Sequence, residues 1–246
     1  MPEAPAVRIP SVDESPCTKV LPFVLALVAG SVDVIGFLGL SGLFVAHITG
    51  NLVIFAAHFV AGSGAPLALM ISVPVFVAAL ALTRVLAAAL ERAGVAPLAP
   101  LLVLQLALLC AFASIAVAAG PRVEPNAPTM VVAGMLGVCA MAVQNALVRI
   151  GLVGAPSTAV LTTDITILSM DLGEMLVGRD AGRMAEARDR VRHTWPAIAG
   201  FLLGCVLGAA CEAALGLRSV LLPTAFAAIA LALGLGSKIA MSRADR

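Results

Sequence analysis

Charged residues are scarce in this sequence, and tyrosine is absent. Only 12% of the 246 residues are charged, the formal net charge is +1, and aromatic side chains make up 4%. A nearly neutral chain has no general attraction to the nucleic-acid backbone, and its Lys and Arg residues are not interleaved with aromatic residues that could stack on bases. We therefore expect no nucleic-acid partner.

Motifs for catalysis and metal binding are missing as well. The sequence contains no HExxH, GxSxG or Walker-type loop and no cluster of Cys and His. Cys17 stands alone, and the other cysteines fall inside apolar runs without a CxxC pair: Cys110, Cys139, Cys205 and Cys211. Such cysteines are typical of small buried side chains. We expect no catalytic residue, no metal site, no cofactor and no disulfide framework, and hence a protein that is not an enzyme.

Apolar residues are what the chain has in excess. They make up 61% of it, with a mean hydropathy of +1.08, whereas soluble domains are roughly 45–50% apolar. We predict an integral membrane protein with lipid as its surroundings. Residues Met1 to Thr18 include acidic side chains and the first apolar run contains Asp33, so we expect no cleavable secretory signal.

Eight apolar runs follow one another along the chain. They cover Leu21–Leu40, Phe44–Ala61, Leu67–Leu90, Pro97–Ala119, Pro128–Ile150, Thr158–Val177, Trp195–Leu217 and Val220–Ile239. About 20 helical residues are needed to cross a hydrocarbon core of roughly 30 Å. The first, third, fourth, fifth, seventh and eighth runs meet this requirement and predict membrane-spanning helices.

The second and sixth runs differ from the others because a helix-start signal lies inside each. Thr49 or Asn51 can cap a helix that continues to about Ala61, and Thr163 or Asp164 can cap one in the sixth run. A helix from Asn51 to Ala61 would be about 16 Å long, about half of a membrane. We interpret both runs as re-entrant half-helices.

The distribution of basic residues favours six spans over eight, because cytoplasmic loops collect Lys and Arg. With eight spans, four of the fifteen Lys and Arg residues would be external, namely Arg84, Arg92, Arg149 and Arg218. With six spans only Arg122 and Arg218 are external, and the other thirteen of the fifteen are cytoplasmic. The six-span topology places both termini in the cytoplasm.

The two halves of the chain resemble each other weakly. Thr49–Ala56 can be aligned with Thr162–Ser169 by residue class, and Asp33 and Asn145 lie at similar distances upstream. Three complete spans in each half require the halves to be inverted, as in many transporters. We predict an all-α integral membrane protein with about six transmembrane helices and two re-entrant half-helices in an inverted 3+3 repeat; eight spans would make the repeat parallel.

This reading divides the chain into one membrane domain and two tails. Residues 1–19 are expected to be a disordered cytoplasmic tail and residues 240–246 a second cytoplasmic tail. The membrane domain covers residues 20–239, with repeat halves at about 20–119 and 127–239.

Polar residues at membrane depth mark the candidate site. Placing a charged side chain at the bilayer centre costs about 2.5 kcal/mol or more, so Asp33 should face a partner or a water-filled path. In the inverted repeat the helix starts near Asn51 and Asp164 meet at the membrane centre, where their N–H groups can bind a polar or anionic group. The alternative is that Thr49, Asn51, Thr163 and Asp164 only cap their helices. The substrate-binding candidates are Asp33, His47, Thr49, Asn51, Gln144, Asn145, Thr163 and Asp164.

Two charged stretches follow in the second half. Asp164, Asp171 and Glu174 share one helix face, which either lines an acidic vestibule or marks the wet end of the segment. Arg179 to Arg192 alternates basic and acidic residues. We expect a short solvated helix there, at the cytoplasmic surface.

These residues also carry a family resemblance. Gly30-Ser31-Val32-Asp33-Val34-Ile35-Gly36-Phe37, Phe44-Val45-Ala46-His47-Ile48-Thr49-Gly50-Asn51 and Gln144-Asn145-Ala146 are similar to the YoaK-type family of bacterial membrane proteins, over about Leu21 to Leu235. The second-half Thr162-Thr163-Asp164 departs from the Thr-Gly of that family. The resemblance implies a multi-pass protein of the bacterial inner membrane with about six helices, and no established substrate.

We therefore expect a secondary transporter or facilitator of a small polar or charged solute. The alternatives are a non-transporting membrane scaffold or assembly protein and, third, a membrane-embedded enzyme. The sequence does not predict the solute, its charge or the ion coupled to it. Nor does it predict the oligomeric state, and a homo-oligomer is one alternative.

The topology is testable with single cysteines at Arg92 and Arg122 in a background that lacks the native cysteines. A membrane-impermeant thiol reagent added to intact cells should leave the Arg92→Cys variant unlabelled and label the Arg122→Cys variant. The opposite pattern would restore eight spans.

Overall fold

The computed structural model describes residues 16–62, 64–120, 124, 127–152, 154–158, 161–178 and 180–244. Residues 16–19 and 237–244 are described by their backbone alone. Most of the predicted N-terminal tail, residues 1–15, lies outside the described residues, as do Arg122 and Arg179.

Helices account for the regular structure of the described residues, and no strand occurs among them. They are α1 (Pro16–Gly39), α2 (Ile48–Val60), α3 (Leu67–Arg92), α4 (Leu98–Ala119), α5 (Pro128–Gly151), α6 (Leu161–Val177), α7 (Ala181–Leu215), the 3-10 turn η1 (Gly216–Val220) and α8 (Leu221–Ala244). Each predicted apolar run corresponds to one helix. Helix α1 begins before the predicted end of the tail at residue 19, and α8 continues into the segment 240–246 that was predicted to be a tail.

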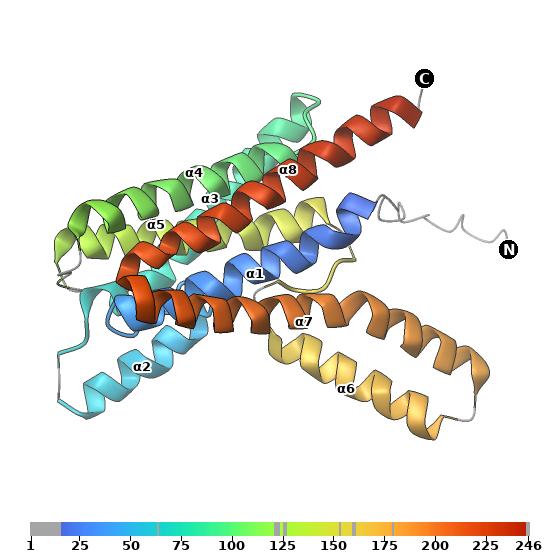
Figure 1. Ribbon diagram of the computed structural model, residues 1–246, viewed down its shortest axis with the longest axis horizontal. Coiled ribbons are helices and arrows are strands. Elements are labelled where there is room, and N and C mark those ends of the chain that lie inside the picture. Colours follow the sequence, from blue (N-terminus) through green and yellow to red (C-terminus); the bar gives the residue numbers. More distant parts are fainter. Residues whose placement is uncertain are drawn as a thin grey trace, which may run out of the picture.

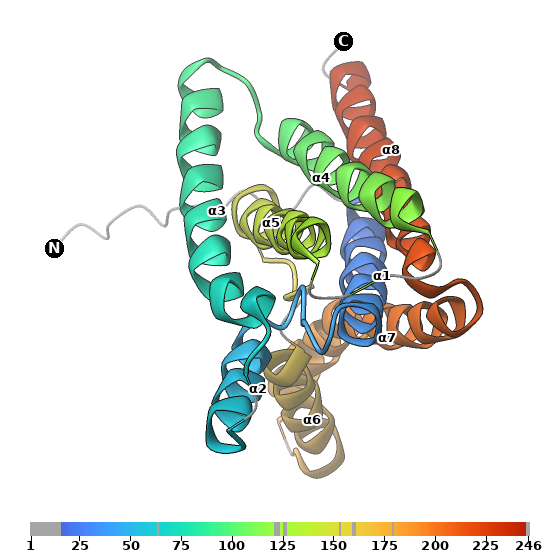
Figure 2. The ribbon, with the colours of Figure 1, turned by 90° about the vertical axis from the view of Figure 1, so that its left-hand side faces the viewer.

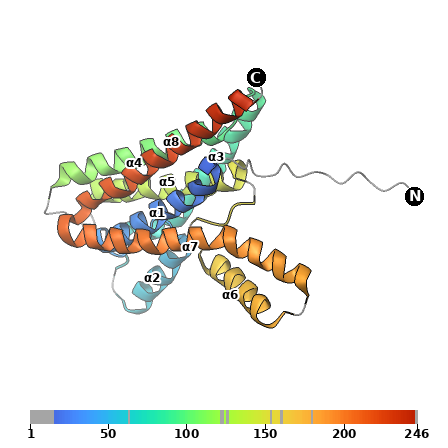
Figure 3. The same ribbon diagram turned by 45° about the vertical axis from the view of Figure 1, so that its right-hand side comes forward.

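The helix predicted within Arg179–Arg192 is present and most of its described side chains are exposed, but the prediction that it is short is wrong. Helix α7 continues without a break from Ala181 to Leu215, with Pro196 in its interior, and α6 packs beside its first half (Figure 3). The Asp180 side chain caps α7 by accepting a hydrogen bond of 2.8 Å from the N–H of Gly182. The charged segment and the apolar segment therefore form one continuous helix, which neither the charges nor Pro196 ends.

Five stretches of the described chain are long and apolar enough to cross a membrane. They are Val20–Gly39, Leu67–Arg92, Leu98–Ala119, Pro128–Gly151 and the 56-residue stretch Ala181–Gly236, which contains both α7 and α8. Helix α2 has 13 residues and α6 has 17. At 1.5 Å per residue these helices are about 20 Å and 26 Å long, shorter than a hydrocarbon core of roughly 30 Å.

The long helices lie roughly along one axis and alternate in direction. Helices α1, α4 and α7 run toward one end of the molecule, and α3, α5 and α8 run toward the other (Figure 1). The first turn of α1 and the last turn of α8 lie at the same end. Helices α2 and α6 leave the same side of the bundle and diverge toward opposite ends (Figure 1).

Helices α1 and α5 form the centre of the bundle (Figure 2). In the apolar segment of each helix, 72% of the residues are buried in α1 and in α5, but only 17% in α3. The main packing pairs occur in matched sets: α1 with α7 and α5 with α3, α1 with α8 and α5 with α4, and α2 with α3 and α6 with α7. The list therefore stays the same when α1, α2, α3 and α4 are exchanged for α5, α6, α7 and α8, in that order.

The tightest of these contacts, between α1 and α7, depends on glycine. A Cβ at Gly204 would lie 2.5 Å from the carbonyl oxygen of Leu27, and a Cβ at Gly208 would lie 2.8 Å from that of Ser31. From the other side, a Cβ at Gly30 would overlap the carbonyl oxygen of Phe201. The small-residue spacing in α7 thus brings two backbones together, as in close membrane helix pairs.

A matched pair of Gly→Ala substitutions tests this contact. Gly204→Ala should lower the free energy of unfolding by about 1–3 kcal/mol, the usual range for overpacking. Gly173→Ala on α6 is the control, because a Cβ there meets nothing within 4 Å. Unfolding in SDS or by steric trapping measures both, and equal stability of the two variants would contradict the close contact.

Candidate functional site

The connection between α1 and α2 folds back along α1 instead of continuing outward. The chain reverses at Ser41 and Gly42, whose φ angles are 54° and 83°. Gly36 makes room for the segment that returns along α1, because a Cβ at Gly36 would lie 2.5 Å from Cγ2 of Val45. Helix α2 consequently starts beside Asp33, six residues before the end of α1 at Gly39.

The Asp33 carboxylate holds this returning segment. Its Oδ1 accepts hydrogen bonds from the backbone N–H groups of Val45, Ala46 and His47, at 2.8, 2.7 and 3.2 Å. Its Oδ2 lies 2.7 Å from His47 Nδ1. Asp33 is only 3% exposed, so these partners replace the water that a buried carboxylate has lost. A negative charge before the first turn of α2 is also favoured by the helix dipole.

Asn51 fixes the same segment from α2. Its Oδ1 accepts the N–H of Phe44 at 2.8 Å, and its Nδ2 donates to the Phe44 carbonyl at 2.8 Å and to Ser72 Oγ on α3 at 3.0 Å. The predicted capping by Thr49 or Asn51 is wrong, since the N-cap residue is His47 and no side chain caps the helix. Asn51 instead lies within the helix and reaches back to the incoming chain.

The connection between α5 and α6 is held differently. Gln144 is fully buried on α5 and donates from Nε2 to the hydroxyl of Thr158 and to the carbonyl of Leu25 on α1, both at 2.9 Å. Its Oε1 accepts a hydrogen bond of 2.7 Å from Gln105 on α4. Gln144 therefore joins the second connection to two neighbouring helices, with neutral groups in place of a carboxylate.

The acidic residues of α6 do not take part in the hydrogen bonds of Gln144. Asp164 is 4% exposed and accepts a backbone hydrogen bond from Ser157, and its Oδ2 has no hydrogen-bond partner among the described residues. Asp171 forms a two-pronged ion pair with Arg190, with Nη2–Oδ1 at 2.7 Å and Nε–Oδ2 at 3.1 Å. That ion pair fastens α6 to α7, so Asp171 has a structural partner.

A cavity of about 570 Å³ lies where the first turns of α2 and α6 approach α3 and α5. Its lining combines polar and apolar side chains: Ala46, His47, Ile48, Thr49, Phe76, Leu80, Arg84, Asn145, Ala146, Arg149, Ile150 and Thr162. This volume lies in the range of small-molecule sites, which are mostly apolar with a few placed polar groups.

The structure separates the predicted site residues into two groups. His47, Thr49 and Asn145 line the cavity. The others do not line it: Asp33, Asn51, Gln144, Thr163 and Asp164. Asp33 and Asn51 lie one layer behind, where they hold the backbone that carries His47 and Thr49.

Two arginines of this cavity are absent from the predicted site residues. Arg84 on α3 and Arg149 on α5 both line it, although their sequence positions indicate membrane topology, and Thr162 lines it in place of Thr163. An arginine within an apolar stretch, eight positions before the helix end at Arg92, was the available signal for Arg84. The repeat alignment also paired Asp33 with Asn145, whereas the neighbouring Gln144 holds the second connection and Asn145 donates within its own helix, to Met141.

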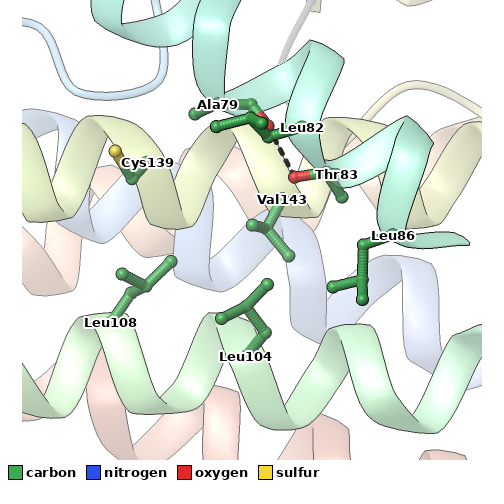
Figure 4. Close-up of a pocket in the computed structure, with 8 residues that line it drawn as sticks. All are labelled: Ala79, Leu82, Thr83, Leu86, Leu104, Leu108, Cys139 and Val143. Atoms are coloured by element: carbon green, nitrogen blue, oxygen red, sulfur yellow. Dashed lines mark hydrogen bonds between the residues drawn. The ribbon is translucent and has the colours of Figure 1, made fainter.

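A smaller cavity of about 320 Å³ lies between α3, α4 and α5 (Figure 4). Leucine and valine side chains dominate its lining, and its one hydroxyl, that of Thr83, already donates to the Ala79 carbonyl at 2.7 Å. It offers no free polar group to orient a solute. The larger cavity is the better candidate site for this reason.

A family model described as DUF1275, protein of unknown function, matches residues 21–233, which confirms the YoaK-type resemblance at the level of the family. Neither a curated protein nor a solved structure matches the chain.

The two layers of the site predict different mutant phenotypes. Asp33→Ala should lower the free energy of unfolding by about 3–5 kcal/mol, because it leaves three backbone N–H groups and the partly buried His47 without their partner. Asn145→Ala should lower it by about 1 kcal/mol or less, since it removes one hydrogen bond within a helix. SDS unfolding of both variants measures the difference, and equal stabilities would contradict the anchoring role of Asp33.

Proposed function

The chain belongs to the DUF1275 family, and we propose that it is a secondary transporter or facilitator of a small polar or charged solute. The observation that carries this proposal is the cavity bounded by the starts of α2 and α6. Its polar groups come from both halves of the chain, with Thr49 and Arg84 from the first and Asn145, Arg149 and Thr162 from the second. A site shared by two halves of a helical membrane protein is typical of transporters.

An inverted 3+3 repeat is the architecture that we propose for this function. Its support is the set of matched packing pairs and the helix directions, since α1 and its counterpart α5 run in opposite directions. The stretch Ala181–Gly236 then holds two spans separated by η1. Helices α2 and α6 are the re-entrant elements, and each packs mainly against one long helix.

Transport in this architecture requires the cavity to open to one side at a time. Rocking of one half against the other around a fixed site is the usual route. Asp33 would keep His47 in place during such motion, because it holds the backbone of Val45, Ala46 and His47 to α1 through three N–H groups. The first turn of α6 contributes Thr162 to the same cavity.

We propose the bacterial inner membrane as the location, with both termini in the cytoplasm. The support is the excess of Lys and Arg on one side of the six-span topology. Arg84 and Arg149 belong to that cytoplasmic set and line the same cavity. The cavity accordingly lies between the membrane centre and the cytoplasmic surface in this proposal.

A non-transporting scaffold is the second candidate, and one observation favours it. Asp33, Asn51 and Gln144 all satisfy their hydrogen bonds inside the protein. Polar residues of this kind lock helices together whether or not a solute binds. The cavity is the feature that a scaffold would not need.

Blocking the cavity separates the two candidates. Thr162→Cys, in a background that lacks the native cysteines, is reconstituted in proteoliposomes and assayed for uptake of acetate, succinate, phosphate, glycine, choline and glycerol with and without a pH gradient. Modification by a bulky methanethiosulfonate should reduce uptake of the transported solute at least about tenfold, because the added group fills a site sized for one small ligand.

The control is Ser169→Cys, which lies on α6 and outside the cavity lining. Its modification should leave uptake unchanged. No uptake of any solute, or equal effects of the two modifications, would favour the scaffold.

A further inference from the structure

We propose that the cavity binds a small organic anion through Arg84 and Arg149; this rests on the proposed transport function. Among the lining residues, the two guanidinium groups are the fixed charges and no Asp or Glu is present. Both arginines extend from long helices, one from α3 and one from α5. The solute class thereby narrows from polar or charged to negatively charged.

Two carboxylates near the cavity, those of Asp33 and Asp164, do not line it. Asp33 faces the N–H groups of Val45 to His47. Asp164 lies two residues beyond Thr162 on α6, about 200° around the helix, so Thr162 lines the cavity while Asp164 does not. Neither acidic group therefore contributes a wall to the space that the arginines face.

The charges of the two arginines are only weakly compensated. Arg84 Nη1 lies 3.5 Å from Oε2 of Glu91 on the same helix, and both side chains are largely exposed, at 59% and 44%. Exposed pairs of this kind contribute little binding energy. Arg149 forms no ion pair with the described part of the chain. Both guanidinium groups can thus bind another anion without losing a strong partner.

The remaining lining fits an organic oxyanion. Arginine presents a planar fork of N–H donors that matches a carboxylate or phosphate. Thr49 and Thr162 supply hydroxyls on the first turns of α2 and α6, where unpaired backbone N–H groups also favour a negative charge. Phe76, Leu80 and Ile150 provide an apolar wall for a carbon skeleton.

An isosteric ligand series tests the sign of the charge. The full chain, purified in neutral detergent, is mixed with benzoate, benzyl alcohol or benzylamine, and with glycerol 3-phosphate or glycerol, and its melting temperature is recorded. Benzoate or glycerol 3-phosphate should raise the melting temperature, and the neutral and cationic counterparts should not.

Charge-removal variants assign the effect to the two arginines. Arg84→Gln and Arg149→Gln should weaken the binding of the effective oxyanion by roughly ten- to hundredfold, as expected for lost hydrogen bonds between charged groups. Arg92→Gln is the matched control, because it removes a positive charge from the end of α3 outside the cavity lining. Arg149→Lys retains the charge without the fork and should bind with intermediate affinity. The melting temperature without ligand verifies that each variant is folded.

A lipid phosphate has the same chemistry as a soluble oxyanion, so micelles doped with phosphatidylglycerol or phosphatidylcholine form a further arm. If phosphatidylglycerol alone stabilises the protein, and this effect is lost in the two Gln variants, the site binds a lipid phosphate. That result would contradict a soluble organic anion as its ligand. A stronger response to benzylamine or benzyl alcohol, no response to any probe, or equal losses in Arg92→Gln would overturn the proposal.

Flux measurements distinguish this inference from the proposed function. Uptake of choline or glycerol that is unaffected by Arg84→Gln and Arg149→Gln would preserve transport and overturn the anion site. Binding of an oxyanion without any uptake would preserve the anion site and overturn transport.

Discussion

The structure depends on how one stretch of irregular backbone is satisfied away from water. Between α1 and α2 the chain folds back along the last third of α1, where three successive N–H groups need acceptors and a single Asp33 oxygen accepts all three. In a bilayer, irregular backbone is tolerated only when protein or a water-filled cavity surrounds it. Asp33 is therefore first a structural anchor, and the start of α2 and the wall of the cavity follow from its position.

The two halves solve the same problem with different chemistry. The first connection is held by a carboxylate and an imidazole, and the second by the Gln144 amide and the Thr158 hydroxyl. Helix α2 relies on Asn51 and Ser72 to join α3, whereas α6 relies on Asp171 and Arg190 to join α7. Matched packing with unmatched polar groups makes the cavity lining asymmetric, with the His47 imidazole from the first half and the Asn145 amide from the second.

Much of the fold was predictable because apolar length determines which segments form long helices. The helix-start signal inside the second run, at Thr49 to Asn51, located the start of α2 at Ile48 within about three residues. Capping was not predictable, because Asn51 contacts Phe44 only once the connection has folded back. The full length of α7 was not predicted, because a run of charged residues is typical of a loop but does not by itself end a helix.

The site was less predictable than the fold. Polarity at membrane depth identifies Asp33 and Asn145, yet it does not reveal that one faces the backbone and the other the cavity. Arg84 and Arg149 reach the same space only because α3 packs on α5. That contact depends on residues far apart in the sequence and has no local signature.

The most direct test of this account is the membrane depth of α2. Spin labels placed singly at Thr49, Leu52, Val53, Phe59 and Val60 report depth through their relative accessibility to oxygen and to a water-soluble nickel complex. The account predicts a depth that decreases steadily from the bilayer centre at Thr49 to one surface at Val60. A maximum of depth in the middle of α2, with both ends at opposite surfaces, would show a complete crossing and contradict the anchored half-helix.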